Sequence, residues 1–75
     1  MDVYSLRFYQ DILRHEESKP CRRHKFTYAT LEEAEAMAIS LMPEILARYG
    51  AKSGYAILDR FLVVVAVGPG RNGDA

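Results

Sequence analysis

The chain has 75 residues, of which 49% are hydrophobic and 27% are charged, with ten cations balanced by ten acids. This length accommodates one small domain, and the composition excludes a disordered chain. The single cysteine, Cys21, excludes an internal disulfide framework, and a net charge of zero provides no global attraction to nucleic acid or anionic lipid.

The N-terminal region predicts a pair of antiparallel strands. Residues 3–14 alternate, with Tyr4, Leu6, Phe8 and Ile12 on the inward side and Ser5, Arg7, Tyr9 and Asp11 on the other. A polar connection ending at Pro20 follows, and residues 25–29 alternate again with Phe26 and Tyr28 inward. We expect a hairpin with a long, charged tip.

A helix is predicted from residue 31 to residue 49. Thr30 and Glu33 match a capping box, and Gly50 suits the position after the helix end. Pro43 predicts either a kink near residues 39–42 or a restart as a second short helix. The expected buried stripe consists of Ala34, Met37, Ala38, Leu41, Ile45 and Tyr49.

Two more strands are predicted after the helix, at residues 55–58 and 61–67, joined tightly through Asp59 and Arg60. One long bent strand from 55 to 67 is the alternative. The pattern defines a single domain over residues 1–68, and residues 69–75 are expected to form a flexible tail.

The fold class predicted is therefore α+β, in the order β-β-α-β-β: a small antiparallel sheet with one Pro-kinked helix packed on one face. Two strand orders fit this pattern. We favour 1-2-4-3, which puts the very apolar run 61–67 inside the sheet. The order 2-1-3-4 would make that run an exposed edge and a route to a homodimer.

One helix covers only one face of a sheet, and the run 61–67 has no polar residue on either side. An uncovered apolar face suggests a contact with a protein partner or a second copy, whereas a folded-back segment would be the plainer explanation. The candidate sheet interface residues are Arg7, Tyr9, Leu62, Val64 and Val65.

A basic segment is the second candidate site. Residues 19–25 contain four cations and no acid, and aromatic residues follow directly, so a loop here could hold phosphates while a ring stacks on a base. A solvated hairpin tip or a contact with an acidic protein is the alternative. The candidate residues of this loop are Lys19, Arg22, Arg23, His24 and Lys25.

Catalytic and metal sites are not expected. Cys21, His24 and His15 supply only three of the four ligands of a structural zinc site, and a Cys/His catalytic pair would lack an orienting group. The sequence predicts no cofactor, no bound metal and no catalytic residue. The run 61–67 is too short to span a bilayer, so we expect a cytoplasmic protein without membrane contact.

Two resemblances add to this interpretation. Residues 30–36, Thr-Leu-Glu-Glu-Ala-Glu-Ala, are similar to the helix start of HicB-type antitoxins. In size and strand–helix–strand order the chain resembles small phage- or mobile-element-encoded anti-defence proteins, including anti-CRISPR proteins. That resemblance implies stoichiometric binding that blocks a host complex, such as a nucleoprotein complex.

The function expected from the sequence is a non-enzymatic protein–protein interaction module, in one version an inhibitor of a host defence complex. The alternative is a small nucleic-acid-binding module that uses the basic segment 19–25.

Overall fold

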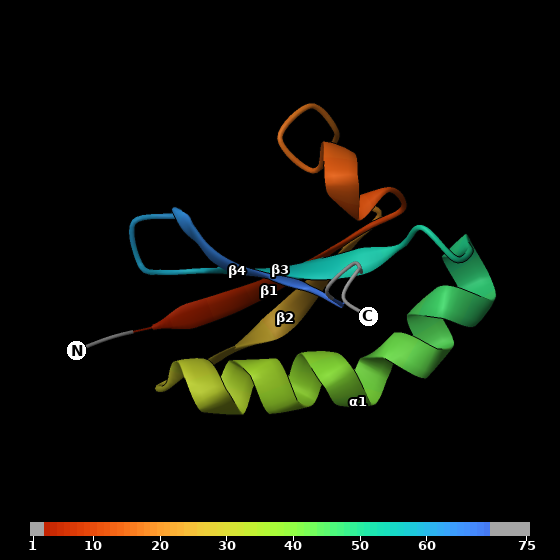
Figure 1. Cartoon of the computed structure of the whole chain (residues 1–75). Helices are drawn as coiled ribbons and strands as arrows, with labels where there is room; N and C mark the ends of the chain where they lie inside the picture. The colour runs from red at the N-terminus through yellow and green to blue at the C-terminus, as the bar shows by residue number, and fades with distance from the viewer. Residues whose placement is uncertain (1–2, 70–75) are drawn as a thin grey trace.

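The computed structural model describes residues 3–69, and the predicted α+β class is confirmed: a four-stranded antiparallel sheet carries one helix on one face (Figure 1). Residues 70–75, most of the predicted tail, lie outside the described range. The elements are β1 (Tyr4–Tyr9), the short 3-10 helix η1 (Ile12–Arg14), β2 (Arg22–Tyr28), α1 (Leu31–Tyr49), β3 (Gly54–Leu58) and β4 (Val64–Gly68).

The strand order is β2-β1-β3-β4, so the favoured order 1-2-4-3 is wrong and the alternative order is the one observed. Each neighbouring pair is antiparallel; Leu6 lies opposite Ile57 in the β1–β3 pair, and Ile57 lies opposite Ala66 in the β3–β4 pair. The strand that contains the most apolar run therefore lies at the edge. It also starts later than predicted, at Val64, after a connection that spans residues 59–63.

Burial on both faces explains why β3 takes a central position. All five residues of β3 are buried: Tyr55 and Ile57 face the helix, while Ala56 and Leu58 belong to a second cluster on the opposite face. β2 contains three cations, and at an edge these remain in contact with water. The order 1-2-4-3 would instead have enclosed β2 between two strands.

The main core lies between the sheet and α1. Small alanines on the helix allow it to approach the sheet closely, because they occupy little space opposite the larger strand side chains. The buried members of this core are Leu6 and Phe8 of β1, Ala34, Ala38, Met42 and Ile45 of α1, and Tyr55 and Ile57 of β3. The inward position of Leu6 and Phe8 is thus as predicted. Half of the predicted helix stripe is fully buried, its other three residues (Met37, Leu41 and Tyr49) are partly buried, and Met42, which was not predicted, is buried.

The helix begins and ends at the predicted residues. The Thr30 hydroxyl accepts a hydrogen bond from the Glu33 backbone N–H at 3.1 Å, and Gly50 closes the helix with a φ of 108°. Pro43 lies inside a single continuous helix, so the restart as a second helix is excluded. Figure 1 shows the second half of α1 bent upward toward the sheet, as a proline within a helix commonly causes.

The segment between β1 and β2 covers part of the face opposite α1, called the outer face below (Figure 1). The predicted strand 3–14 is too long: it ends at Tyr9, and Asp11 caps η1 by accepting from the Leu13 N–H. Ile12 packs with Tyr9, Ala56 and Leu58 on the outer face, so it does not share the side of Leu6 and Phe8. A folded-back segment thus shelters the second face of β3.

Gly68, at the end of β4, allows Tyr55 to pack closely across the sheet. The two residues are paired in register, and a Cβ at position 68 would overlap the Tyr55 ring. Burial, with a smaller contribution from Glu35, raises the pKa of the Tyr55 hydroxyl. The ring therefore fixes β4 against β3 at the end farthest from the hairpin loop.

Candidate functional site

The most distinctive surface is an apolar strip along the edge of the sheet. We define the β4 strip as Phe61, Leu62, Val63, Val64, Val65 and Val67, all of them exposed. The exposed fraction is largest in the hairpin loop, at 71% for Phe61 and 63% for Leu62. Six exposed apolar side chains of this size present on the order of 500 Å², within the roughly 300–600 Å² of the largest patch on a typical monomer, which often marks an interaction site.

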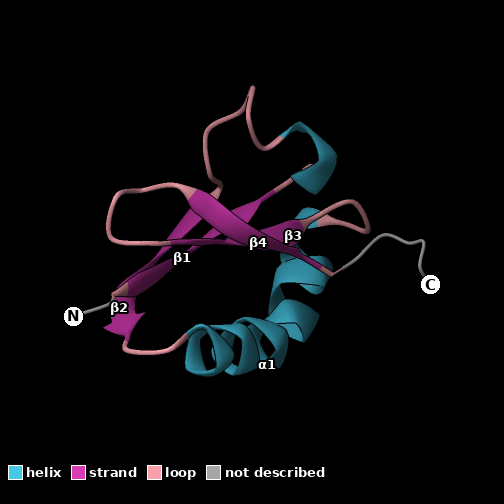
Figure 2. Cartoon of the chain, turned by 60° about the vertical axis from the view of Figure 1, so that its left-hand side comes forward, coloured by secondary structure: helices cyan, strands magenta, loops and turns pink. Residues whose placement is uncertain are grey.

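The backbone of the β4 strip is also open on one side. β4 pairs with β3 along one edge and has no strand on its other edge within the described residues. The register shifts by one between Ile57 and Leu58, so Val65 has no partner across the pair. A shallow hollow separates Val64–Val67 from His15 and Glu16 of the segment that covers the outer face. Figure 2 shows β4 running across the front of the sheet, with the hairpin loop beside it.

Asp59 holds the hairpin loop in shape. One oxygen of its carboxylate accepts hydrogen bonds from the backbone N–H groups of Phe61 at 2.8 Å and Val63 at 3.0 Å. The Asp59 backbone N–H donates to the Val63 carbonyl, and the Leu62 N–H donates to the Asp59 carbonyl. These bonds turn the chain so sharply that Leu62 adopts a φ of 65°, a left-handed conformation that is costly for a leucine.

The five predicted sheet interface residues do not form one surface. Leu62, Val64 and Val65 belong to the β4 strip. Arg7 and Tyr9 lie on β1, which β3 separates from β4. Tyr9 is only 4% exposed and packs against Ile12 and the His15 ring, so it offers no contact surface.

The basic residues lie mainly on a strand and not in a loop. Arg22, Arg23, His24 and Lys25 form the first half of β2, the other edge of the sheet, while Lys19 precedes that strand. The Arg22 guanidinium donates to the Glu44 carboxylate of α1 at 3.1 Å. The predicted basic loop is therefore wrong in its structure, although four of its five residues do lie together.

Arg23 and Arg7 face each other across the β1–β2 pair. Directly opposed like charges destabilise a sheet, and an anion bound between them would remove that repulsion. The β2 register slips between Ser5 and Arg7 of β1, which bulges His24, Lys25 and Phe26 out of the regular pairing. Phe26, predicted to point inward, is 60% exposed as a result.

His24 belongs to a small aromatic cluster on the same edge. Its ring stacks on Tyr28 with a hydrogen bond of 2.8 Å between Nε2 and the phenol oxygen, and it meets Phe26 edge to face. Burial, with a smaller effect of the nearby Arg22, lowers the pKa of His24, so the imidazole is neutral at neutral pH. Lys25 lies 5.8 Å from the centre of the Phe26 ring.

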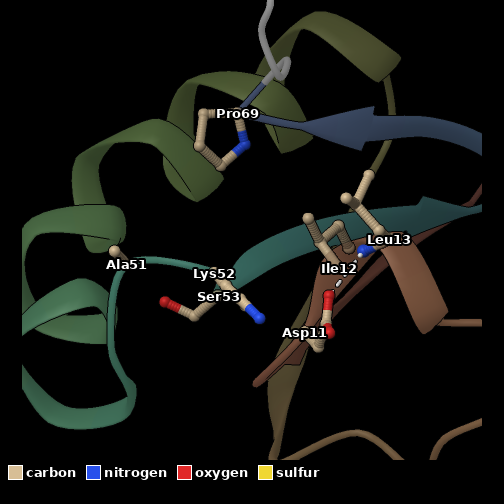
Figure 3. A pocket seen from close by; sticks show the side chains of 7 residues that line it. All are labelled: Asp11, Ile12, Leu13, Ala51, Lys52, Ser53 and Pro69. Atoms are coloured by element: carbon tan, nitrogen blue, oxygen red, sulfur yellow. Dashed lines mark hydrogen bonds between the residues drawn. The ribbon is translucent and has the colours of Figure 1, made fainter.

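A pocket of about 280 Å³ lies where η1, the α1–β3 turn and Pro69 meet (Figure 3). Its charged lining residues are Asp11 and Lys52, and the Asp11 carboxylate already accepts from the Leu13 N–H. Ser53 is buried and its hydroxyl donates to the Gly50 carbonyl at 2.5 Å. The Ser53 hydroxyl thus has a structural partner, and the pocket provides no paired nucleophile and base.

Cys21 and the two histidines do not form a metal site. Within residues 3–69 no three His, Cys, Asp or Glu side chains are close enough together to hold a metal ion. Burial raises the pKa of the Cys21 thiol and outweighs the opposing effects of a backbone hydrogen bond and of Arg22, so the thiol stays protonated at neutral pH.

Phe61, Val63 and Val67 belong to the apolar run singled out in the sequence, but they were not among the candidate interface residues. Asp59 is the residue in the sequence that could have indicated an exposed turn at the start of this run. An aspartate two residues before a hydrophobic run can accept from following N–H groups and extend a turn into that run.

No helix in the described part of the chain is long and apolar enough to cross a membrane.

No protein-family model, no curated protein and no solved structure matches the chain. The fold and surface define a small α+β domain with two unlike sheet edges, one apolar and one basic.

Leu62→Gly should raise the free energy of unfolding by about 0.5–1 kcal/mol, because glycine tolerates positive φ although it costs backbone entropy. Phe61→Gly, in the same loop but without positive φ, should lower it by about 0.5–1 kcal/mol. Urea unfolding followed by circular dichroism measures both values. Equal destabilisation by both substitutions would show that Leu62 is not strained.

Proposed function

We propose that the chain is a non-enzymatic protein-binding module that uses the β4 strip as its contact surface. The observation that carries this proposal is an exposed, uncharged edge strand with an open backbone. Such an edge can accept a strand of a partner: main-chain hydrogen bonds supply affinity, and flanking side chains supply specificity. Edge strands are usually protected by charges, prolines or bulges; β4 has no charge and no proline between Val64 and Gly68, and its one irregularity is the register shift at Val65.

The strained loop supports the same proposal. A large apolar residue at positive φ and high exposure, as at Leu62, contributes little to the stability of the monomer. Strain of this kind is commonly retained where it serves contact with a ligand. Leu62 and its neighbour Phe61 would be the anchors at one end of the strip.

Catalysis receives no support from the described residues. The Cys21 thiol is held protonated, the Ser53 hydroxyl donates to a carbonyl, and the His24 imidazole is paired with the Tyr28 hydroxyl. Each of these reactive groups has a structural environment in place of a catalytic partner. Stoichiometric inhibition of a host complex is one form that such binding could take, and a lone cysteine suits the cytoplasm as its compartment.

Val65→Lys should abolish binding of the partner, since an ammonium group at the edge opposes strand addition. The matched control is Ile39→Lys, because Ile39 is 58% exposed and lies on α1, which packs against β1, β2 and β3. Affinity capture from the source cells at low bait concentration, followed by mass spectrometry, compares wild type with both variants. A protein retained by wild type and Ile39→Lys but lost by Val65→Lys is expected; identical capture by all three would contradict the proposal.

A second candidate function, binding of single-stranded nucleic acid at the β2 edge, is favoured by the opposed Arg7 and Arg23 and by the exposed Phe26. The two guanidinium groups would contact phosphates, and the aromatic ring would stack on a base. Because the chain as a whole is neutral, this binding would depend on a local cluster of cations.

Replacing Arg7 and Arg23 together by alanine should weaken binding of a labelled oligothymidylate and reduce the slope of log K against log salt by about 1.4, or about 0.7 per cation. Fluorescence anisotropy at several salt concentrations measures this slope. The control removes two exposed arginines elsewhere, Arg14 and Arg48, and should leave the slope nearly unchanged. Equal effects of both double variants, or no binding by wild type at low salt, would exclude the nucleic-acid function.

A further inference from the structure

Resting on the proposed function, we infer that the strand added to β4 is β4 of a second copy of this chain, antiparallel to the first across a two-fold axis. The two four-stranded sheets would then form one continuous sheet with both apolar edges in its centre. Such an isologous contact uses the same surface of both copies: residue i of one copy meets residue j of the other, and j meets i.

The distribution of charge decides which edge can pair with itself. Across a two-fold axis residue i of one copy meets residue j of the other and j meets i, so the charges of one edge face the charges of the same edge, and opposed like charges destabilise a sheet. From Phe61 to Pro69 the chain has no ionisable side chain, so the strand itself meets its copy without repulsion. The charged neighbours of this edge are Arg60, which lies 4.9 Å from the centre of the Phe61 ring, and Glu16, which with His15 borders the hollow beside Val64–Val67. The β2 edge would bring Arg22, Arg23 and Lys25 against the same cations. Self-pairing is therefore favoured at β4 and opposed at β2.

The arrangement of the helix leaves the β4 edge accessible. α1 packs against β1, β2 and β3, and its axis runs beneath that part of the sheet (Figure 1). The segment that covers the outer face contacts β3 through Ile12 and leaves a hollow beside β4. A second sheet can therefore approach β4 in the plane of the first.

The area of the strip sets the strength expected of the dimer. Two strips of on the order of 500 Å² each give a contact of about 1,000 Å², which is below the roughly 1,200–2,000 Å² that stable specific interfaces bury in total. Contacts of this size are typically weak, so we expect a dissociation constant in the micromolar range. The dimer should appear and disappear with concentration.

Residues 70–75 are poor candidates to cover the strip instead. Their composition is Gly-Arg-Asn-Gly-Asp-Ala, which has one small apolar side chain and two charges. Such a segment cannot replace the apolar contacts that Phe61, Leu62 and the valines would make with the β4 strip of a second copy.

Sedimentation equilibrium over a range of protein concentrations tests the dimer. For wild type, the mass should rise from 8.5 kDa toward twice that value. Val65→Lys should weaken association at least tenfold with an unchanged circular dichroism spectrum, whereas Ile39→Lys should associate like wild type. Wild type that stays monomeric at millimolar concentration, or a Val65→Lys variant that associates like Ile39→Lys, overturns the inference.

Disulfide trapping provides a second readout that does not depend on a disruptive substitution. In a Cys21→Ser background, Val64→Cys, Val65→Cys and Val67→Cys are introduced one at a time. A residue at or beside the two-fold axis lies within the roughly 4.4–6.8 Å Cα separation that a disulfide allows, so at least one variant should cross-link rapidly. The control variant Ile39→Cys should not cross-link. If all four cysteine variants cross-link at the same rate, the proposed pairing of β4 with its copy is contradicted.

The two proposals fail in different ways. A monomeric wild type that still captures a protein through Val65 removes only the self-pairing. An associating wild type whose Val65→Lys variant also associates removes the self-pairing, and the proposed function fails as well only when Val65→Lys captures the same proteins as wild type.

Discussion

The structure depends on the burial of β3 on both faces. Tyr55 and Ile57 pack against α1, and Ala56 and Leu58 pack against Ile12 and Tyr9 on the outer face. Between residues 3 and 69 the chain provides one α-helix and one short folded-back segment with which to cover the sheet. Both coverings meet at β3, so the strands farther from it are less sheltered. β4 is the apolar strand left at the edge as a consequence.

The two edges of the sheet differ in a way that follows from this arrangement. β2 carries cations that need water, and one of them, Arg22, bonds to Glu44 of the helix. β4 carries only apolar side chains and gains nothing from exposure to water. An exposed apolar edge is costly for solubility unless another chain covers it. This contrast is why the proposed contact surface lies at β4, and why self-pairing at β4 deepens that proposal.

Much of the fold could be predicted from the sequence, because local signals were strong where they existed. The Thr30 cap, Gly50 and the helical stripe fixed α1 at both ends, and alternation identified the inward side of β1. Strand order was not accessible in this way, since a period of two shows which residues share a face but not which strand lies beside them. Ile12 has the even-numbered spacing of the inward residues of β1, but the strand has ended before it, because Asp11 caps the start of η1.

The candidate site was predicted in part, and for related reasons. Leu62, Val64 and Val65 were identified because a strand without polar residues needs cover on both faces. Tyr9 was not recognised as buried because the residue that covers it, Ile12, was assigned to the other face. The basic residues were placed in a loop because the bulge around His24 interrupts the alternation of β2. β4 was predicted inside the sheet because of its hydrophobicity. The more apolar of two adjacent strands is not always the one that is more deeply buried.

The measurement that tests this account most directly is the set of interstrand nuclear Overhauser effects in the monomer at low concentration. The structure pairs Arg7 with Ala56 and Leu6 with Ile57, so backbone protons of β1 and β3 should show strong cross-strand effects. Cross-strand effects between β2 and β4, with none between β1 and β3, would place β4 inside the sheet and contradict the exposed apolar edge.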